Sequence, residues 1–512
     1  MKTSSILFTL LICFNFVLFN GFAQSITPTL PSQLYSYSFN KINTSENDHF
    51  LITPFKIGGS TTISNKPEII DGNGDLIWFS SNGYENCSDF KYYPSSQIYS
   101  YTISEAGVIK TILLDEQMNG LDTILANGRL DNAHDIQQAE NGNWLFTITT
   151  KDTVDLSGST FYNGTNGVAN TIIIGFGIQE VDANGNIVFE WDSNDHIPPT
   201  ETYLFYGYNV SNFDYCHGNA VEEDSDGHLL LSFRHLNAIN KIHRSTGAII
   251  WKLGGHSSDF IFTNDPGFSG QHDIRKLANG NYSLFNNANM APVPKISKGK
   301  EFSLDTINWT ATLVNETVHP TALYASAMGN YQTTDSNNKL LSYGLIYRPK
   351  PSKRYFDSNN SLLDEIYFAD SVMTYRAHHK EASMFPRPEI TCELIGTTWF
   401  LSTTLPYTNY SWSNNETTSD IEITTPGTYQ VWVNYGSGML GSIPLNVASI
   451  TDPCGALGIE ENTIQTEEDF SVFTTSGQLV LQPEANQLYI KRYASGKTEK
   501  WIFLPFKTNN YE

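Results

Sequence analysis

The chain has 512 residues with a formal net charge of −23 at pH 7, and only 16% of its residues are charged. Because nucleic acids and anionic membranes reward clusters of Lys and Arg, and this acidic chain has none, the composition excludes both as electrostatic partners. The length predicts at least two structural units, since single cores stop growing near ~250–300 residues. Abundant Tyr, Phe, Thr, Ile and Asn, with little amphipathic helical pattern, predict an all-β fold.

The chain begins like an exported protein. Lys2, the apolar run 6–19 and the small-residue site Gly21-Phe22-Ala23 predict a signal peptide over residues 1–23. No other stretch approaches the ~18 apolar residues of a membrane-spanning helix. We therefore expect a periplasmic, secreted or cell-surface protein. After removal of the peptide four cysteines remain, too few for a disulfide scaffold in so long a chain: Cys87, Cys216, Cys392 and Cys454.

Hairpin-like units recur along residues 24–385. Gly turns feed short strands that end in Trp78, Trp191 and Trp251, and apolar runs such as 229–231 are too short for helices. A second set repeats the same hairpin three times with a His in the same place, ahead of an Asn-Gly or Asp-Gly turn, at His134, His217 and His272. A weaker fourth copy carries Asn330. Repeats of short strands predict a six-bladed β-propeller in which these three His converge on the axis.

Two further segments follow the predicted propeller. Alternating strands over 389–450 resemble an immunoglobulin-like β-sandwich. The tail 466–512 resembles, in degenerate form, the C-terminal sorting domain of the type IX secretion system, without the Asn-Pro motif at its start. This tail implies secretion machinery as a partner.

The three His admit several interpretations. The repeat can reuse His-Asp as a turn cap, with Asp135 and Asp273 bonding nearby amides, although Gly218 replaces the Asp after His217. Three imidazoles can also bind zinc with an open position, but here they come from separate hairpins and no carboxylate lies at a short spacing. The Asp-rich stretches 71–75 and 224–227 suggest calcium, yet neither continues to a Glu at the twelfth position, so we expect β-turns and no metal.

Other chemistry-bearing residues lie nearby. Arg234 follows the strand 229–231, and its planar fork suits the oxygens of a tetrahedral anion; the alternative is an exposed ion pair. Arg376 is a second candidate for that role. Cys216 is either a thiol nucleophile or a small buried residue, and we favour the buried residue. No nucleophile elbow, Walker loop or dinucleotide fingerprint offers a competing chemistry.

Together these motifs resemble the bacterial arylsulfate sulfotransferase family. The resemblance spans roughly residues 51–376 and is carried by Ala133-His-Asp-Ile136, His217-Gly-Asn219, Ser232-Phe-Arg234, residues 247–255 and Gln271-His-Asp273. It implies a six-bladed propeller that moves a sulfuryl group from an aryl sulfate to a phenol, with small-molecule substrates and no cofactor.

The resemblance also implies residue roles. His272 would become transiently sulfurylated, His134 and His217 would assist proton transfer, and Asn219 and Arg234 would bind sulfuryl oxygens. A threonine contact of the family has no clear counterpart among Thr317, Thr321 and Ser326, and a family disulfide could involve Cys87 or Cys216. The rival functions are a non-catalytic surface propeller that binds a partner and a metal- or quinone-dependent propeller enzyme.

Overall fold

The computed structural model describes residues 24–57, 63–203, 207–318, 321–346, 348–369, 371–381 and 385–451, and the strands at 470–474, 488–493 and 498–502. The expected signal peptide lies outside these residues. Two compact units are present. One comprises the chain up to residue 390 with 402–421 and 428–444, and the other comprises 391–401, 422–427 and the residues from 445 on.

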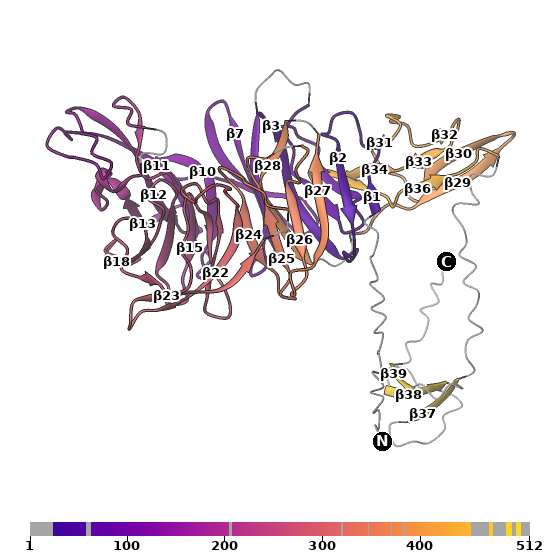
Figure 1. The fold of residues 1–512 in the computed structure, drawn as a ribbon. Helices are drawn as coiled ribbons and strands as arrows, with labels where there is room; N and C mark the ends of the chain where they lie inside the picture. Colours follow the sequence, from indigo (N-terminus) through magenta and orange to yellow (C-terminus); the bar gives the residue numbers. More distant parts are fainter. Residues whose placement is uncertain are drawn as a thin grey trace, which may run out of the picture. The chain divides into compact units, whose positions relative to one another are not determined.

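The first unit is built from antiparallel sheets, which confirms the all-β prediction (Figure 1). One sheet has the order β28 (Val372–Glu381), β3 (Asp48–Lys56), β4 (Glu68–Asp71), β5 (Leu76–Ser80), β35 (Gly438–Gly441), β34 (Val431–Tyr435) and β31 (Tyr410–Trp412). The next contains β6 (Asn86–Tyr93), β7 (Ile98–Glu105), β8 (Val108–Leu114) and β9 (Gly120–Ile124). The third contains β10 (Leu130–Gln138), β11 (Trp144–Val154), β12 (Thr171–Val181) and β13 (Ile187–Asp192), with β14 (Phe213–Asp214) parallel to β12.

Three more sheets complete this unit. One contains β15 (Gly218–Glu223), β16 (Leu229–Phe233), β17 (Ala238–Ile242) and β18 (Ile249–Gly254). Another contains β20 (His272–Lys276), β21 (Tyr282–Asn286), β22 (Lys298–Asp305), β23 (Thr310–Thr317) and β19 (Ile261–Phe262). The last contains β24 (Asn330–Thr333), β25 (Lys339–Ser342), β26 (Lys353–Phe356), β27 (Leu362–Phe368), β2 (Tyr37–Lys41) and β1 (Gln24–Ile26).

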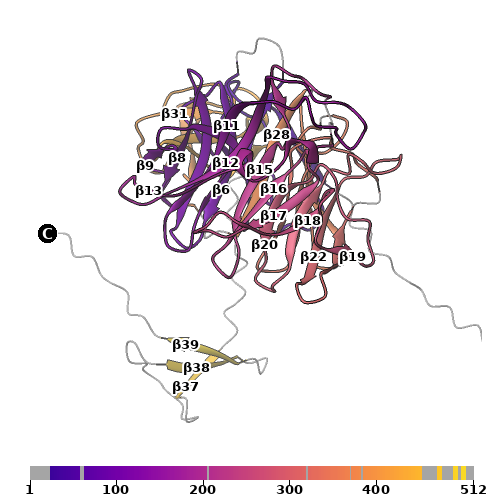
Figure 2. The ribbon, with the colours of Figure 1, turned by 90° about the vertical axis from the view of Figure 1, so that its left-hand side faces the viewer.

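These sheets follow one another in a closed series. The first strands β6, β10, β15, β20 and β24 each contact the first strand of the next sheet, and β24 contacts β28, which contacts β6. Figures 1 and 2 show neighbouring sheets side by side in chain order. Strand β28, from the C-terminal side, pairs with β3, while β2 pairs with β27. Both ends of this part of the chain are therefore hydrogen-bonded into its sheets.

Local sequence explains the hairpins. Gly142, Gly227 and Gly280 have φ of +85°, +79° and +88°, in turns that join the first two strands of three sheets. Glycine takes this conformation without a Cβ penalty, so these predicted turns are confirmed. The short apolar runs predicted as strands are also confirmed, in β16 and β18.

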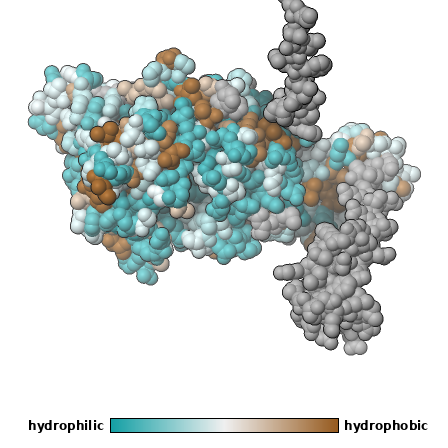
Figure 3. All heavy atoms as spheres, turned by 60° about the horizontal axis from the view of Figure 1, so that its bottom comes forward, coloured by the Kyte–Doolittle hydropathy of each residue, from teal (hydrophilic) through white to brown (hydrophobic). Residues whose placement is uncertain are grey.

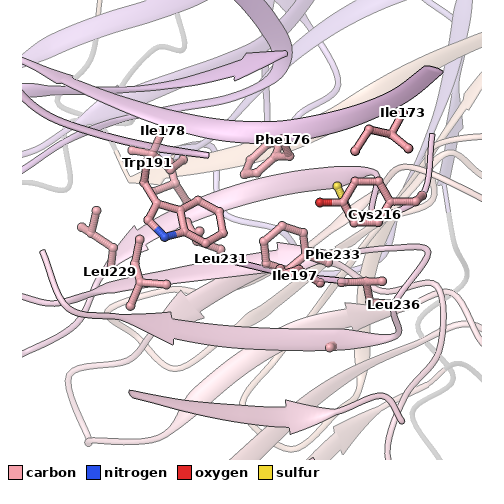
Figure 4. Packing of buried hydrophobic residues seen from close by; sticks show 14 of the residues in the cluster. Ile173, Phe176, Ile178, Trp191, Ile197, Cys216, Leu229, Leu231, Phe233 and Leu236 are labelled. Carbon is pink, nitrogen blue, oxygen red and sulfur yellow. The ribbon is translucent and has the colours of Figure 1, made fainter. Parts of the chain in front are cut away.

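Apolar side chains fill the space between neighbouring sheets. In Figure 4, residues of β12 and β13 such as Phe176 and Trp191 face Leu229, Leu231 and Phe233 of β16. This packing fixes β15 against β10, which positions the inner strands of both sheets. On the face shown in Figure 3, apolar patches lie scattered among polar residues.

The segment 389–450 is divided between the two units. Its strands β31, β34 and β35 belong to the sheet of β3–β5, through pairing of β35 with β5. A separate immunoglobulin-like sandwich over 389–450 is therefore not confirmed. The remaining strands make two small sheets. One has the order β29 (Ile390–Ile395), β30 (Thr398–Thr403), β32 (Ile421–Glu422), and the other pairs β33 (Gly427–Tyr429) with β36 (Leu445–Val447).

In the tail, β37 (Phe470–Thr474), β38 (Leu488–Tyr493) and β39 (Thr498–Ile502) form a three-stranded antiparallel sheet. The rest of the expected sorting domain lies outside the described residues. The helical elements of the described chain are two 3-10 turns, η1 (Ser193–Asp195) and η2 (Pro199–Glu201). Among the described residues, no helix has the length and apolar content needed to cross a bilayer.

Candidate active site

His272 is the first residue of β20 and is only 1% exposed. Its Nδ1 lies 2.8 Å from Asn287 Oδ1 and 3.1 Å from the Gly270 carbonyl oxygen. Since both are oxygen acceptors, Nδ1 carries a proton and donates it. Nε2 accepts a hydrogen bond of 3.2 Å from the Met328 amide. Burial, followed by the charge of Arg234, holds the pKa of His272 well below its usual value, so the ring is neutral with its lone pair on Nε2.

His217 lies immediately before β15, in a left-handed conformation with φ of +47°. Its Nδ1 is 2.5 Å from Asp214 Oδ2, and its backbone amide donates to Asp214 Oδ1 at 3.0 Å. Burial raises the pKa of Asp214, but the hydrogen bond from His217 and the charges of nearby histidines outweigh it, and the pKa is lowered. Asp214 is therefore a carboxylate at neutral pH. A carboxylate on Nδ1 orients an imidazole and stabilises its protonated form.

His134 lies within β10 and is half-buried. Its ring Nδ1 and its backbone amide both contact Asn132 Oδ1. The ring meets His217 edge to face, with centroids 5.0 Å apart. Burial, then the proximity of His217, lowers the pKa of His134 to about 3. His134 is thus a neutral imidazole beside one that is held by a carboxylate.

The three His do not occupy equivalent positions, contrary to the sequence prediction. His134 and His272 each lie eight positions before the glycine of their turn, whereas His217 lies ten positions before Gly227. By this count the counterpart of the other two is Asn219, inside β15. His217 nevertheless lies against His134, because it folds back from the start of β15 onto Asp214.

Arg234 lies in the turn between β16 and β17 and is 2% exposed, so an exposed ion pair is ruled out. Its Nη2 donates to the Ser326 carbonyl oxygen at 2.9 Å, and its Nη1 lies 3.0 Å from His235 Nε2. His235 in turn donates from Nδ1 to the Asp214 carbonyl at 2.7 Å and stacks on His217 at 4.7 Å between centroids. Burial lowers the pKa of His235 to about 3. The guanidinium is therefore fixed in place against the histidine cluster.

Asn219 is fully buried and bridges β15 to β20. Its Nδ2 donates to the Gln271 carbonyl at 2.9 Å, and its Oδ1 lies 3.4 Å from the Asp273 amide nitrogen. These two partners flank His272 on both sides. The structure thus places Asn219 as a clamp on the backbone of His272.

A cavity of about 360 Å³ adjoins this cluster. It reaches His134 and Met328, whose amide contacts His272, and the Tyr375 ring lies 6.0 Å from that of His134. Its walls are mostly apolar and its lining comprises Phe55, Asn86, Cys87, Ser88, Thr102, Ile103, Ser104, Ile109, Ala133, His134, Met328 and Tyr375. A mostly apolar cavity with a few convergent polar groups suits a small aromatic ligand.

Arg376, the second candidate for anion binding, has a different environment. It is 1% exposed, and its Nη1 lies 3.1 Å from Asp89 Oδ1 and 3.2 Å from Asp135 Oδ1. Its Nη2 donates to the Asn219 carbonyl at 2.9 Å, and its Nε lies 3.5 Å from Asp273 Oδ1. The carboxylates that follow His134 and His272 thus join a buried ion network across β6, β10, β20 and β28. The turn-cap interpretation of these two Asp is wrong, because their carboxylates pair with Lys and Arg side chains: Asp135 with Lys91 and Arg275, and Asp273 with Arg275.

The metal and thiol alternatives can be compared with the geometry. Among the described residues, the donor atoms close enough to share an ion belong to Asp214, His217 and His235, without His134 or His272. Two of those atoms, His217 Nδ1 and Asp214 Oδ2, already bond each other, and His235 Nε2 faces Arg234. Cys216 is buried, with its thiol pKa raised by burial, so it is a packed residue and not a thiolate.

The remaining sequence alternatives are resolved locally. Asp71 Oδ1 accepts from the amides of its own turn while Oδ2 pairs with Arg387 at 3.0 Å, as expected for a β-turn. Cys87 and Cys216 are both free. Of the three candidate threonine counterparts, Ser326 contacts Arg234, through its carbonyl. Thr317 bonds Tyr331 and Asn360, and Thr321 bonds Arg354.

Sequence reasoning missed several residues of this site. Asp214, three residues before His217, and His235, next to Arg234, both lay within the motif region and were detectable as neighbours of candidates. Asn287 and the Met328 amide carried no such signal, because they reach His272 from the end of β21 and from the loop before β24.

Comparison with known proteins gave one family match. Residues 114–368 match the model of the arylsulfotransferase (ASST) family, which supports the resemblance seen in the sequence. No curated protein matches the chain. Similar solved structures include a protein of unknown function from Bacteroides caccae, with 10% identity and a TM-score of 0.39, covering 65% of this chain and 98% of that one. Another is a catalytically inactive variant of virginiamycin B lyase from Staphylococcus aureus with quinupristin, with 14% identity and a TM-score of 0.33, covering 72% and 96%.

Proposed function

We propose that this chain is an exported, six-bladed propeller enzyme that transfers a sulfuryl group from an aryl sulfate to a phenol through a sulfohistidine at His272. The observation that carries the proposal is the neutral His272 ring, whose Nε2 holds the lone pair and faces the amide of Met328, a residue that lines the apolar cavity. The family match over residues 114–368 supports the reaction class.

In the first half-reaction the aromatic ring of the donor occupies the cavity and its sulfur approaches His272 Nε2. The Met328 amide releases Nε2, whose lone pair forms the S–N bond while the S–O bond to the aryl group breaks. The electron pair stays on the phenol oxygen, which takes a proton from His217. Asp214 compensates the charge of protonated His217 before the transfer. The second half-reaction reverses these steps with an acceptor phenol.

Transfer of this kind needs fixed donors and charge more than a strong base, by analogy with phosphoryl transfer. Arg234 supplies a buried positive charge close enough to lower the pKa of His272. His134 is a neutral hydrogen-bonding partner beside His217. Asn219, for which the sequence suggested sulfuryl contacts, is assigned to holding the backbone of His272, since both ends of its amide have protein partners.

The test is intact-protein mass spectrometry after brief mixing with 4-nitrophenyl sulfate, under conditions that preserve an acid-labile adduct. We expect a sulfuryl-sized mass gain in the wild type that added phenol discharges, and none in His272→Ala. An adduct that persists in His272→Ala would move the nucleophile to another residue. Absence of both adduct and phenol release across several donors would favour the non-catalytic binding propeller.

A further inference from the structure

Asn287, directly after β21, is fully buried and has no freedom of orientation. Its Nδ2 donates to the carbonyl oxygens of Ala325 at 2.9 Å and Met328 at 3.0 Å. A carbonyl oxygen only accepts, so the nitrogen of the amide must face these two groups. The oxygen Oδ1 is thereby turned toward Nδ1 of His272, 2.8 Å away.

Three contacts decide which nitrogen of His272 carries its proton: Nδ1 faces two acceptors, Asn287 Oδ1 at 2.8 Å and the Gly270 carbonyl oxygen at 3.1 Å, and Nε2 faces the Met328 amide. Oδ1 of an amide can only accept, so it requires N–H at Nδ1. The Met328 amide, which can only donate, requires a lone pair at Nε2. We propose that Asn287 is a positioning residue that keeps the proton on Nδ1 of His272 and so presents Nε2 as the nucleophile. The catalytic part of this inference rests on the proposed function, but the tautomer does not.

The two reacting histidines differ in the partner at Nδ1. His217 has the negatively charged carboxylate of Asp214, whereas His272 has a neutral amide, which orients the ring without adding charge. The charged and titratable neighbours that lower the pKa of His272 most are Arg234, His217 and His134. The partners at Nδ1 therefore distinguish the acid, His217, from the nucleophile, His272. Asp214 and Asn287 differ in one group of the side chain, O⁻ in Asp214 and NH₂ in Asn287.

Retention of the proton also serves the second half-reaction. When Nε2 bonds sulfur, the ring keeps its Nδ1 proton and becomes a cationic N-sulfo imidazole. Asn287 Oδ1 continues to accept that proton and cannot remove it. When the acceptor oxygen attacks sulfur, the S–N electron pair returns to Nε2 and the neutral ring is restored, so the imidazole leaves without a further proton transfer.

The test records ¹⁵N–¹H correlation spectra of the histidine rings in the full-length protein, with His272 assigned by its loss in His272→Ala. Wild type should show His272 protonated at Nδ1 and bare at Nε2. Asn287→Leu, close in size, and the smaller Asn287→Ala remove the nearer of the two acceptors at Nδ1 and leave the Gly270 carbonyl at 3.1 Å, so part of the population should shift to the Nε2-protonated tautomer and give a mixture. Both should also form the sulfuryl adduct at least about tenfold more slowly, the loss expected from one hydrogen bond.

Asn330→Leu is the matched control. Asn330 is also fully buried and bonds a backbone partner, Ala377, at 2.8 Å and 3.1 Å, but it has no bond to His272. It should lose stability and keep the wild-type tautomer. If both Asn287 variants fail to fold, the wild-type spectrum still decides which nitrogen of His272 carries the proton. Nε2 protonation in the wild type, or an unchanged tautomer and rate in the Asn287 variants, would overturn the inference. If the Asn287 variants change the tautomer of His272 as expected but the wild type forms no sulfuryl adduct, the proposed function alone would be refuted.

Discussion

Replacing Asp214 by Asn tests whether the Asp214–His217 pair supplies the proton to the leaving phenol. The substitution keeps size and one acceptor oxygen but removes the charge that faces Nδ1 at 2.5 Å. A charge-assisted hydrogen bond contributes roughly 1.5–3 kcal/mol. The side chains of His217 and Asp214 are 27% and 34% exposed, so solvent reduces the contribution of this hydrogen bond to about 1–2 kcal/mol. The expected loss in rate is about five- to thirtyfold.

The loss should depend on the leaving group. Phenols that leave easily as anions, such as 4-nitrophenol, need little protonation, whereas unsubstituted phenol needs more. Adduct formation by Asp214→Asn should therefore be nearly normal with 4-nitrophenyl sulfate and slow with phenyl sulfate, as measured by rapid-quench mass spectrometry across a series of substituted donors. In a His217→Ala background, Asp214→Asn should cause no further loss in the rate of adduct formation. An equal loss with every donor would refute the role of this pair in proton transfer.

Three further predictions concern the surroundings of the site. Arg376→Met should lower the free energy of unfolding by about 3–5 kcal/mol, because it leaves three buried carboxylates, Asp89, Asp135 and Asp273, with two cations, Lys91 and Arg275, and so one buried negative charge is not compensated. Arg129→Met, at a pair where Arg129 is 49% exposed, should cost below about 1 kcal/mol. Similar urea midpoints for the two variants would contradict the buried network. The pKa of His235 is lowered to about 3, so its neutral form contributes stability fully above pH 6.5, and that contribution falls by up to about 1.4 kcal/mol per pH unit as the pH drops toward 3. Relative to His235→Asn, the wild type should therefore lose about 2 kcal/mol of unfolding free energy between pH 6.5 and pH 5. The same pH dependence of the urea midpoint in wild type and variant would disprove this. EDTA should leave sulfuryl transfer unchanged, and a loss restored by zinc would favour the metal-dependent alternative.

The sequence by itself determined the all-β class, the hairpins and the region of the site. Turn conformation depends on neighbouring residues, so Gly142, Gly227 and Gly280 specify their hairpins locally. The repetition of these hairpins indicated that His134 and His217 would meet, and their rings do.

Only the tertiary structure decided what each residue of the site contacts. The likeness of the three hairpins gave His217 the same position as His134 and His272, because the motif does not encode the fold of His217 toward Asp214. The resemblance implied that Asn219 binds sulfuryl oxygens, and the structure shows contacts of its amide with the Gln271 carbonyl and the Asp273 amide, on either side of His272. The tautomer of His272 depends on Asn287 and on a backbone amide 56 residues away, at Met328. Such partners come from separate sheets brought together by packing, so no local pattern in the sequence records them.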